Sequence, residues 1–483
     1  MPKSQNQKVF WLFCLGLAGF LFLPELMKQG MFFDGLAYST VSFSMANGLG
    51  SFWEPALSVS MWNPFYGHPP LVLFLQAKLF QLLGNHWFIE RIYAILIFGF
   101  NTLVLVAIWK RVSENHKHLA WYAVLLWLIS PGIYTFFARN LLEPTMALFT
   151  LSSILFFIRS LQSQKRSNFF LGLSVLAVLC AFLAKGPIGL FPLCMPFLHA
   201  FFVQKRSAIQ SIVANGRMLI YFALTTAFLL SFEAPRTSIL AYLNEQVITS
   251  IAGEGRNHVD GRLHIIWVFL EESMYMVFLS ILIGYLSYRK FGWKLRDSET
   301  IRWGVFFIAI SICSAFPVAL SPKQSSFYIL ASFAPLALGC TCIISEALEL
   351  SIMRLKNLPW FSKVALPFVS LLIVSAFIFN WQLFGSYRNK DAIMITDVKT
   401  MISYLPKKSP ITTNETSFKM VTSIHAYLQR YGQLDLDTTE RPITYVLRLS
   451  DTIVPPNYIP IDLPLKLYHL YYYPANQVEL ESL

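Results

Sequence analysis

Charged residues are scarce in this chain of 483 residues: 13% are Asp, Glu, Lys or Arg, whereas 55% are hydrophobic. A soluble domain of this length could not bury so much apolar surface, so the composition excludes an ordinary soluble protein. The mean hydropathy of +0.53 favours a helical membrane protein with apolar spans of about 17–25 residues. The aromatic share of 16%, with 43 phenylalanines, fits helices that face lipid.

Cysteine is also sparse, and none of the six cysteines lies in a predicted loop. All of them fall within apolar runs: Cys14, Cys180, Cys194, Cys313, Cys340 and Cys342. A disulfide framework or a zinc site needs cysteines in loops or at ligand spacing. We therefore expect these residues to be small hydrophobic side chains in the protein interior.

The sequence shows no internal repeat, no low-complexity tract and no cleavage site of small residues after its first apolar run. That run starts at Val9, behind Lys3 and Lys8, and ends at Pro24, which is typical of an uncleaved signal anchor. The net charge of +12 does not indicate a nucleic-acid partner. The basic residues form short clusters between apolar runs, as cytoplasmic anchoring loops do.

The apolar runs predict about eleven membrane spans. They cover residues 9–27, 87–109, 119–137, 144–161, 168–184, 187–204, 217–233, 264–288, 302–320, 325–345 and 364–384. Residues 168–204 are too long for one span, because a helix of that length would measure ~54 Å against a hydrocarbon core of ~30 Å. Lys185-Gly186-Pro187 is therefore expected to be a tight turn between two short spans.

The basic clusters predict the orientation of the chain. With a cytoplasmic N-terminus, every rich cluster falls on the cytoplasmic side. The opposite side then receives the loops 28–86, 138–143, 185–186, 234–263 and 321–324, together with the C-terminal segment. This pattern predicts a multi-pass protein of the bacterial inner membrane whose acidic and histidine residues of interest face the periplasm.

Two segments are predicted to be ordered outside the membrane. Residues 71–83 are apolar but short and are interrupted by polar side chains, which indicates an interfacial helix. Residues 391–483 are polar and are expected to form a small soluble α/β domain that folds apart from a transmembrane domain of residues 1–390 and is dispensable for chemistry. Its predicted elements are strands near 410–412, 419–421 and 443–448 and a helix near 422–431. The sequon at Asn414 is attributed to chance.

The predicted periplasmic loops carry the candidate functional residues. Asp34-Gly35-Leu36-Ala37-Tyr38 follows the first span, and Gly67-His68-Pro69-Pro70-Leu71 precedes the interfacial helix. The next such loop contains Arg139-Asn140-Leu141-Leu142-Glu143-Pro144. Each has a plain alternative. Asp34 could be a solvated loop charge or a helix cap, and His68 could be an interface residue. Arg139 and Glu143 could pair with each other one helical turn apart.

Two later motifs add cations. Lys185 lies in Leu183-Ala184-Lys185-Gly186-Pro187, and Lys323 precedes Tyr328 in Ser321-Pro322-Lys323-Gln324-Ser325-Ser326-Phe327-Tyr328. The plain alternative for Lys185 is a lysine that snorkels to the membrane interface.

The order of these motifs resembles that of lipid-phosphate-dependent membrane glycosyltransferases of the GT-C type, namely the protein O-mannosyltransferases and the aminoarabinose transferases that modify lipid A. In both families an acidic residue opens the first outer loop, and Pro-Pro-Leu leads into a helix along the membrane. The resemblance covers about residues 10–345 in span order and loop motifs. The chain departs from it at Gly35 and Gly67, where relatives often carry acidic residues.

The resemblance implies transfer of a sugar from a polyprenyl-phosphate donor to lipid A, an envelope glycan or a protein. Asp34 would be the catalytic base or help to hold the acceptor, and Glu143 would assist it; both could hold a divalent metal with His68. The residues expected to bind substrate are His68, Arg91, Arg139, Lys185, Lys323 and Tyr328. The loop 234–263, with Asn244, Glu245, Arg256, His258 and Arg262, is expected to form a lid.

Two other functions stay open. A transporter or lipid flippase would place charges in mid-membrane, often with an inverted repeat, whereas these charges gather on one side. A non-catalytic scaffold or binding relative is compatible with the missing acids at Gly35 and Gly67. An activity assay on Asp34→Asn distinguishes that relative from an enzyme.

Overall fold

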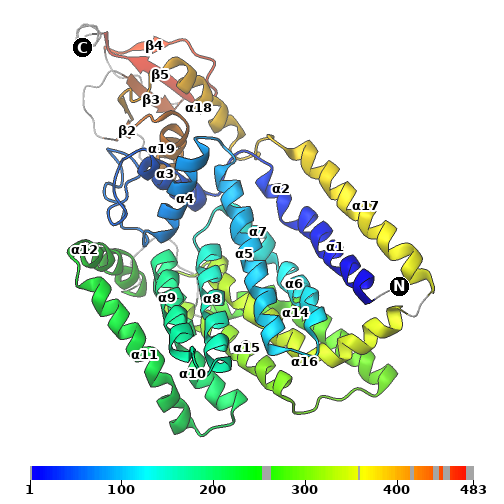
Figure 1. Cartoon of the computed structure of the whole chain (residues 1–483). Coiled ribbons are helices and arrows are strands. Elements are labelled where there is room, and N and C mark those ends of the chain that lie inside the picture. Colours follow the sequence, from blue (N-terminus) through cyan, green and yellow to red (C-terminus); the bar gives the residue numbers. More distant parts are fainter. Residues whose placement is uncertain are drawn as a thin grey trace. The chain divides into compact units, whose positions relative to one another are not determined.

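The computed structural model describes residues 3–252, 261, 263–356, 359–413, 418–438, 445–449 and 457–474. It is mostly helical with one small sheet near the C-terminus (Figure 1), as the sequence predicts. The chain divides into two compact units. The first comprises Met1–Glu25, Ala94–Ala138 and Leu142–Leu383, and the second comprises Leu26–Tyr93, Arg139–Leu141 and Phe384–Leu483.

The first unit holds most of the membrane helices. Its helices, some of which continue into the second unit at their ends, are α1 (Lys3–Leu21), α2 (Leu23–Leu26), α5 (Ile89–Val112), η1 (Lys117–Leu119), α6 (Ala120–Leu128), α7 (Pro131–Phe136), η2 (Phe137–Arg139), α8 (Glu143–Gln162), α9 (Ser167–Lys185), η3 (Pro187–Cys194), α10 (Met195–Leu198), η4 (His199–Val203), α11 (Ala208–Leu230), α12 (Glu233–Tyr242), η5 (Leu243–Ile248), α13 (Thr249–Ala252), α14 (His264–Phe291), α15 (Glu299–Ala315), η6 (Phe316–Leu320), η7 (Ser326–Ile329), α16 (Leu330–Lys356) and α17 (Pro359–Leu383).

Among the described residues, eight helices are long and apolar enough to cross a membrane. A ninth candidate is the pair Lys117–Leu128 and Pro131–Arg139, which bends by 73° at its break. The two remaining predicted spans correspond to shorter apolar helices, Gln7–Leu21 and Pro187–Val203. A multi-span membrane protein is therefore confirmed, while the count of eleven spans and their orientation stay predictions.

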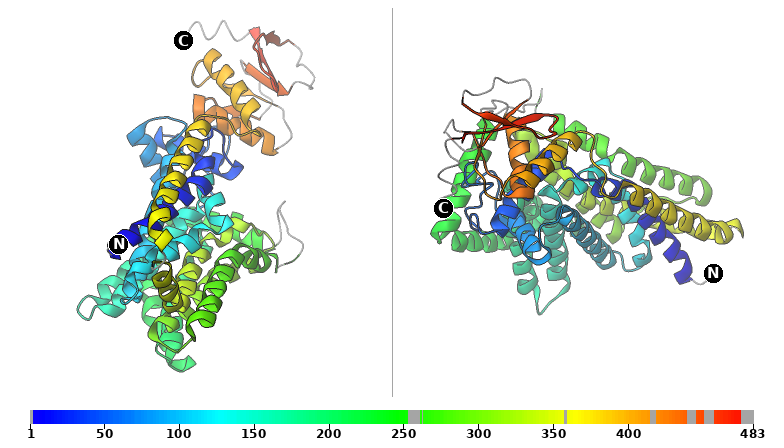
Figure 2. Two further views of the ribbon diagram at one scale, coloured as in Figure 1. Left: turned by 90° about the vertical axis from the view of Figure 1, so that its right-hand side faces the viewer. Right: turned by 90° about the horizontal axis from the view of Figure 1, so that it is seen from above.

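Helices α1 and α17 lie side by side in Figures 1 and 2 because small residues let their backbones approach. A Cβ atom at Gly19 would lie 2.8 Å from Cβ of Ala376. The side-chain amide of Asn380 donates to the Gly19 carbonyl at 2.7 Å. The contact therefore combines close packing with an interhelical hydrogen bond in an apolar setting.

The predicted tight turn at Lys185-Gly186-Pro187 is confirmed. Helix α9 ends at Lys185, and Gly186 has φ = +97°, a backbone conformation that favours glycine. Pro187 then begins η3, where its fixed φ suits the first helical position. Helix η3 returns along α9, since a Cβ atom at Gly189 would lie 2.8 Å from the Ala181 carbonyl oxygen.

The second unit joins the first predicted loop to the C-terminal segment. Its elements are α3 (Phe33–Ala46), α4 (Leu71–Leu83), α18 (Ala392–Tyr404), β1 (Ile411–Thr412), α19 (Phe418–Gly432), β2 (Leu436–Asp437), β3 (Tyr445–Leu449), β4 (Ile459–Ile461) and β5 (Tyr468–Tyr472). The strand order is β2-β1-β3-β5-β4. Strand β1 pairs in parallel with β2 and β3, whereas β5 is antiparallel to β3 and β4.

One hydrophobic core serves both parts of this unit. Figure 2 shows α18, α19 and the strands gathered together, and their buried side chains include Val398, Tyr427 and Leu470. Met31 and Leu36 from the first loop belong to the same core. The second unit therefore extends beyond the predicted domain of residues 391–483, and independent folding of that segment stays a prediction.

The elements predicted for the C-terminal segment are partly confirmed. The strand near 410–412 is β1, and the helix near 422–431 is α19. Strand β3 covers the described part of the strand near 443–448, because residues 443 and 444 lie outside the described residues, as does the sequon at Asn414. The strand at 419–421 is wrong, because α19 begins at Phe418. Three residues are too few to define a strand, and the helical period continues through them.

The prediction that the cysteines are interior side chains is confirmed for three of the six, and all six thiols are free. Cys14, Cys340 and Cys342 are buried, and the other three are half-buried.

Candidate functional site

Asp34 lies in the first turn of α3, a helix that the sequence did not predict. The N-terminus of a helix favours a carboxylate electrostatically. Phe32, at the N-cap, supplies no side-chain cap. Asp34 is half-buried, whereas residues 35–45 are all buried. The structure therefore places the Asp34 carboxylate at the end of a helix that is fixed along its length.

His68 approaches the same helix one turn further on. Tyr38 shares a helix face with Asp34, because residues four apart are neighbours on an α-helix. The His68 ring packs edge-on against Tyr38, with 5.4 Å between the ring centroids. Pro69 and Pro70 then lead into α4, which confirms a helix at residues 71–83.

The described residues were expected to include a metal site at Asp34, Glu143 and His68. Within the described part of the chain, no three His, Cys, Asp or Glu side chains approach closely enough to hold a metal ion. A zinc site takes at least three protein ligands. Asp34 and His68 belong to the second unit and Glu143 to the first. The predicted metal site at Asp34, Glu143 and His68 therefore stays a prediction, and the chemistry below uses no metal.

The loop at Arg139–Leu141 packs on the start of α3. Asn140 has φ = +56°, which asparagine tolerates better than most residues. Its Nδ2 donates to the Gly35 carbonyl at 2.9 Å, and its Oδ1 accepts from Gln76 Nε2 at 2.5 Å. A Cβ atom at Gly35 would collide with the Arg139 carbonyl. No sequence pattern selects Asn140 or Gln76, although Asn140 lies in the motif of residues 139–144 and Gln76 in the helix predicted at residues 71–83.

Arg139 itself lies beside the residues that precede Asp34. Its guanidinium carbon is 5.3 Å from the centroid of the Phe32 ring, a cation–π distance. Its side chain is half-buried. The structure thus brings Asp34, His68 and Arg139 to the same helix.

Arg91 is occupied by backbone carbonyls. Its Nη2 donates to Gly30 at 2.6 Å and to Lys28 at 3.1 Å, and its Nη1 donates to Trp87 at 2.9 Å. These bonds tie the start of α5 to the segment before α3. They account for the burial of Arg91, and a role in substrate binding stays a prediction.

Glu143 and Lys185 form a buried ion pair in the first unit. Lys185 Nζ lies 2.9 Å from Glu143 Oε1, and the two side chains are 5% and 0% exposed. Glu143 begins α8 and Lys185 ends α9, so each charge sits at the favourable end of a helix dipole. A snorkelling lysine would keep its ammonium group in water, so that alternative is wrong for Lys185.

Tyr328 and Tyr242 enclose this pair. Lys185 Nζ lies 5.4 Å from the Tyr328 ring centroid, and the Tyr242 hydroxyl donates to the Lys185 carbonyl at 3.1 Å. Burial raises the pKa of the Tyr242 hydroxyl, and the neighbouring Tyr328 and Glu143 raise it further. Tyr242 therefore remains a neutral donor. No sequence motif identifies Tyr242 as a functional residue. It is the last residue of α12, within the segment 234–263 that the sequence predicts to be a loop.

The predicted lid is helical at residues 234–252. Helices α12, η5 and α13 cover residues 233–252, and Asn244 and Glu245 lie in η5. Arg256, His258 and Arg262 lie outside the described residues.

Lys323 lies in an ordered loop of the first unit. The neighbouring Gln324 accepts from the Ile265 amide at 2.7 Å and donates to the Ser321 carbonyl at 3.0 Å. The Lys323 amide donates to the Ser321 hydroxyl at 3.1 Å. This loop holds the half-buried Lys323 side chain five residues before Tyr328.

The ion pair allows a thermodynamic prediction. Lys185→Met should destabilise the protein by about 3–5 kcal/mol, because it leaves the Glu143 carboxylate buried without its ion-pair partner. Adding Glu143→Gln should recover much of that loss. Unfolding of the detergent-purified variants measures both effects. Lys205→Met, which removes an exposed ion pair with Asp297, should change stability little. Additive losses for Lys185→Met and Glu143→Gln would contradict the pairing.

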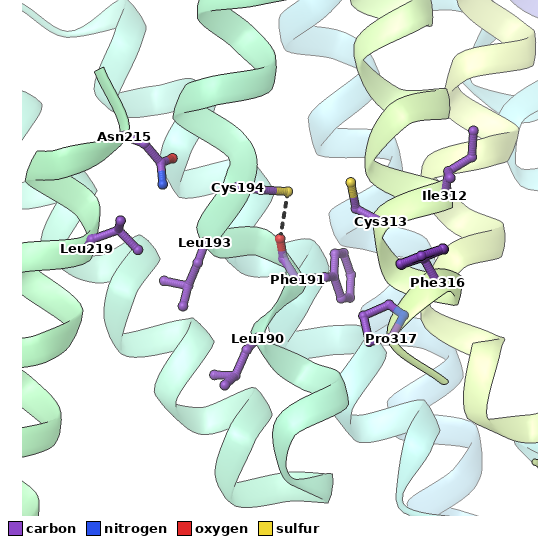
Figure 3. Close-up of a pocket in the computed structure, with 10 residues that line it drawn as sticks. All are labelled: Leu190, Phe191, Leu193, Cys194, Asn215, Leu219, Ile312, Cys313, Phe316 and Pro317. Carbon is purple, nitrogen blue, oxygen red and sulfur yellow. Dashed lines mark hydrogen bonds between the residues drawn. The ribbon is translucent and has the colours of Figure 1, made fainter. Parts of the chain in front are cut away.

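An apolar cavity of about 460 Å³ opens in the same unit between η3, α11 and the end of α15 (Figure 3). Its lining residues are Leu190, Phe191, Leu193, Cys194, Asn215, Leu219, Ile312, Cys313, Phe316 and Pro317. Two of its polar groups bond to the backbone, since Cys194 donates to the Phe191 carbonyl and Asn215 Oδ1 accepts from the Phe197 amide. The cavity therefore suits an apolar chain better than a polar ligand.

The structure is similar to solved membrane proteins. ArnT from Cupriavidus metallidurans bound to undecaprenyl phosphate matches with a TM-score of 0.66 and 12% identity, over 98% of this chain and 99% of that chain. The archaeal oligosaccharyltransferase AglB from Archaeoglobus fulgidus, in complex with an inhibitory peptide and a dolichol-phosphate, matches with a TM-score of 0.50 and 12% identity, over 92% and 69% of the two chains. Residues 67–231 match the family described as dolichyl-phosphate-mannose-protein mannosyltransferase.

The chain has the fold of the GT-C glycosyltransferases. The resemblance seen in the loop motifs is thereby confirmed for the fold. The family segment includes His68, Arg91, Arg139, Glu143 and Lys185. No curated protein is significantly similar to the chain in sequence.

Proposed function

We propose that the chain is a glycosyltransferase that moves one sugar from a polyprenyl-phosphate donor to an acceptor at the periplasmic face of the bacterial inner membrane. The acceptor is lipid A, an envelope glycan or a protein. The observation that carries the proposal is the GT-C fold, which extends over 98% of the chain and has Asp34 at the start of α3. The apolar cavity of the membrane unit also suits a lipid substrate.

Asp34 is the better base of the two predicted carboxylates. Glu143 is fully buried and held by Lys185, whereas Asp34 is half-buried at a helix end. Asp34 would take the proton of the acceptor hydroxyl, whose oxygen attacks the anomeric carbon. The bond from that carbon to the phosphate oxygen breaks, and the phosphate leaves as an anion without needing an acid. Direct attack inverts the anomeric configuration.

Lys323 is proposed to neutralise the donor phosphate as this bond breaks. Its side chain is half-buried in an ordered loop, next to the neutral Gln324. Arg139 and Lys185, which were also expected to bind substrate, are proposed as further ligands of the phosphate. Lys185 is the weaker of these two, because its ammonium group already binds Glu143. Glu143 is proposed to assist by holding Lys185 in place.

The donor-binding role is tested with Lys323→Ala. We expect the KM for the polyprenyl-phosphate donor to rise by roughly 10- to 100-fold, as for the loss of one charged hydrogen bond, with a smaller fall in kcat. Initial rates across donor concentrations measure both constants. Lys78→Ala, which removes an exposed lysine on α4, is the matched control. An unchanged donor KM in Lys323→Ala would remove Lys323 from the phosphate site.

A further inference from the structure

We infer that helix α19 of the C-terminal segment positions Asp34, and that Arg430 and Tyr427 are its positioning residues. The inference rests on the proposed role of Asp34 as catalytic base. It gives the C-terminal segment a part in the reaction through the positioning of Asp34.

Arg430 anchors α19 against the first loop. Its side chain is fully buried, and its Nε donates to Glu90 Oε1 at 2.8 Å. Its Nη2 donates to the His86 carbonyl at 2.9 Å. The guanidinium carbon lies 5.0 Å from the Phe43 ring of α3 and 4.4 Å from the Phe80 ring of α4. A planar guanidinium can fill this slot and bond at its edges, which a lysine ammonium cannot do.

Glu90 links Arg430 to the chain on both sides of Asp34. The Ser39 hydroxyl on α3 donates to the Glu90 carboxylate. On its other side, Glu90 lies 3.5 Å from Arg91, which holds the Gly30 carbonyl. The buried charge of Arg430 is thus connected to the backbone before Asp34 and to the helix after it.

Tyr427 holds the same segment directly. It lies one turn before Arg430 on α19, and its hydroxyl accepts the Met31 amide hydrogen at 3.2 Å. Further along, the Thr40 hydroxyl donates to the Ala426 carbonyl at 3.1 Å. The chain is therefore fixed to α19 on either side of Asp34. A shift of about 1 Å in a catalytic group can cost on the order of a hundredfold in rate, so these bonds matter for turnover.

Two matched substitutions on α19 test the inference. Tyr427→Phe removes only the hydroxyl that binds Met31. Tyr431→Phe makes the same change one turn later, where the hydroxyl has no hydrogen-bond partner among the described residues. We expect Tyr427→Phe to lower kcat by roughly 3- to 100-fold with the donor KM unchanged, and Tyr431→Phe to leave both constants near wild type.

Amide hydrogen exchange tests the positioning role independently of enzyme activity. Amide hydrogen exchange in peptides covering residues 28–36 should be faster in Tyr427→Phe than in Tyr431→Phe, because the Met31 amide loses its partner. Arg430→Lys, which keeps the charge but loses the planar donor set, should give a larger loss of kcat and the same direction in exchange.

The outcomes separate this inference from the proposed function. Unchanged kcat and unchanged exchange in Tyr427→Phe, with Asp34→Asn inactive, would overturn the positioning role alone. Faster exchange without a change in kcat would show that α19 holds the segment but does not serve the reaction, which also overturns it. Wild-type turnover in Asp34→Asn would instead remove the base on which the inference rests.

Discussion

Asp34→Asn should lower the turnover number by at least about a hundredfold while donor binding stays near normal. A general base contributes roughly 10²–10⁴-fold, and an amide cannot take the acceptor proton. The substitution preserves the shape of the side chain, which is half-buried at the start of α3, so the protein should still fold. Single-turnover and steady-state rates with a purified polyprenyl-phosphate sugar measure the effect.

Glu54→Gln is the matched control for this prediction, because Glu54 is an exposed carboxylate in the same loop. It should retain wild-type rates. Near-wild-type turnover in Asp34→Asn would remove Asp34 from the mechanism and make Glu143 the remaining carboxylate. If Glu143→Gln were equally silent, the non-catalytic alternative would be favoured.

Truncation after residue 390 should abolish transfer and make the first loop susceptible to proteases. The truncated chain lacks Arg430, so Glu90 loses a buried ionic partner, a change that typically costs about 3–5 kcal/mol. It also exposes Met31 and Leu36, which are buried in the shared core of the second unit. This expectation differs from the dispensable tail predicted from the sequence.

Limited proteolysis of the purified truncated chain, followed by mass spectrometry, would locate new cleavage sites within residues 28–86. Recovery of the chain from the membrane fraction shows whether its spans still insert. A truncated chain that is protease-resistant and fully active would restore the independent-domain prediction and contradict the role assigned to α19.

The sequence predicted what depends on local pattern. Long apolar runs define the membrane helices, because a lipid environment requires them to be apolar and helical. The turn at Gly186 was predictable from span length and from its Lys-Gly-Pro sequence. The identity of the loop motifs was sufficient to indicate the GT-C fold.

What the sequence could not predict depends on distant partners. Helix α3 contains three serines and a threonine, and its burial comes from α4 and from α19, whose Arg430 lies 391 residues from Ser39. The pairing of Lys185 with Glu143 likewise joins two motifs that each suggested a separate role. Local sequence patterns do not predict contacts between residues so far apart in the chain.

The structure also explains the two glycines that depart from the family pattern. A side chain at Gly35 would collide with the Arg139 carbonyl, and a Cβ atom at Gly67 would lie 2.7 Å from the Phe65 ring. A side chain at Gly35 is therefore excluded by the backbone of Arg139, whereas one at Gly67 would require the Phe65 ring to shift. The missing acid at Gly35 thus has a packing explanation and gives no independent support to a non-catalytic relative.

The most direct test compares the cell envelopes of three strains. A deletion strain is complemented with the wild-type chain, with Asp34→Asn, or with an empty vector, and lipid A, envelope glycans and glycoproteins are compared by mass spectrometry. We expect one class of molecule to carry an added sugar residue only in the wild-type strain. Identical profiles for the wild-type and empty-vector strains would contradict a glycosyltransferase, and a sugar restored by Asp34→Asn would contradict Asp34 as its base.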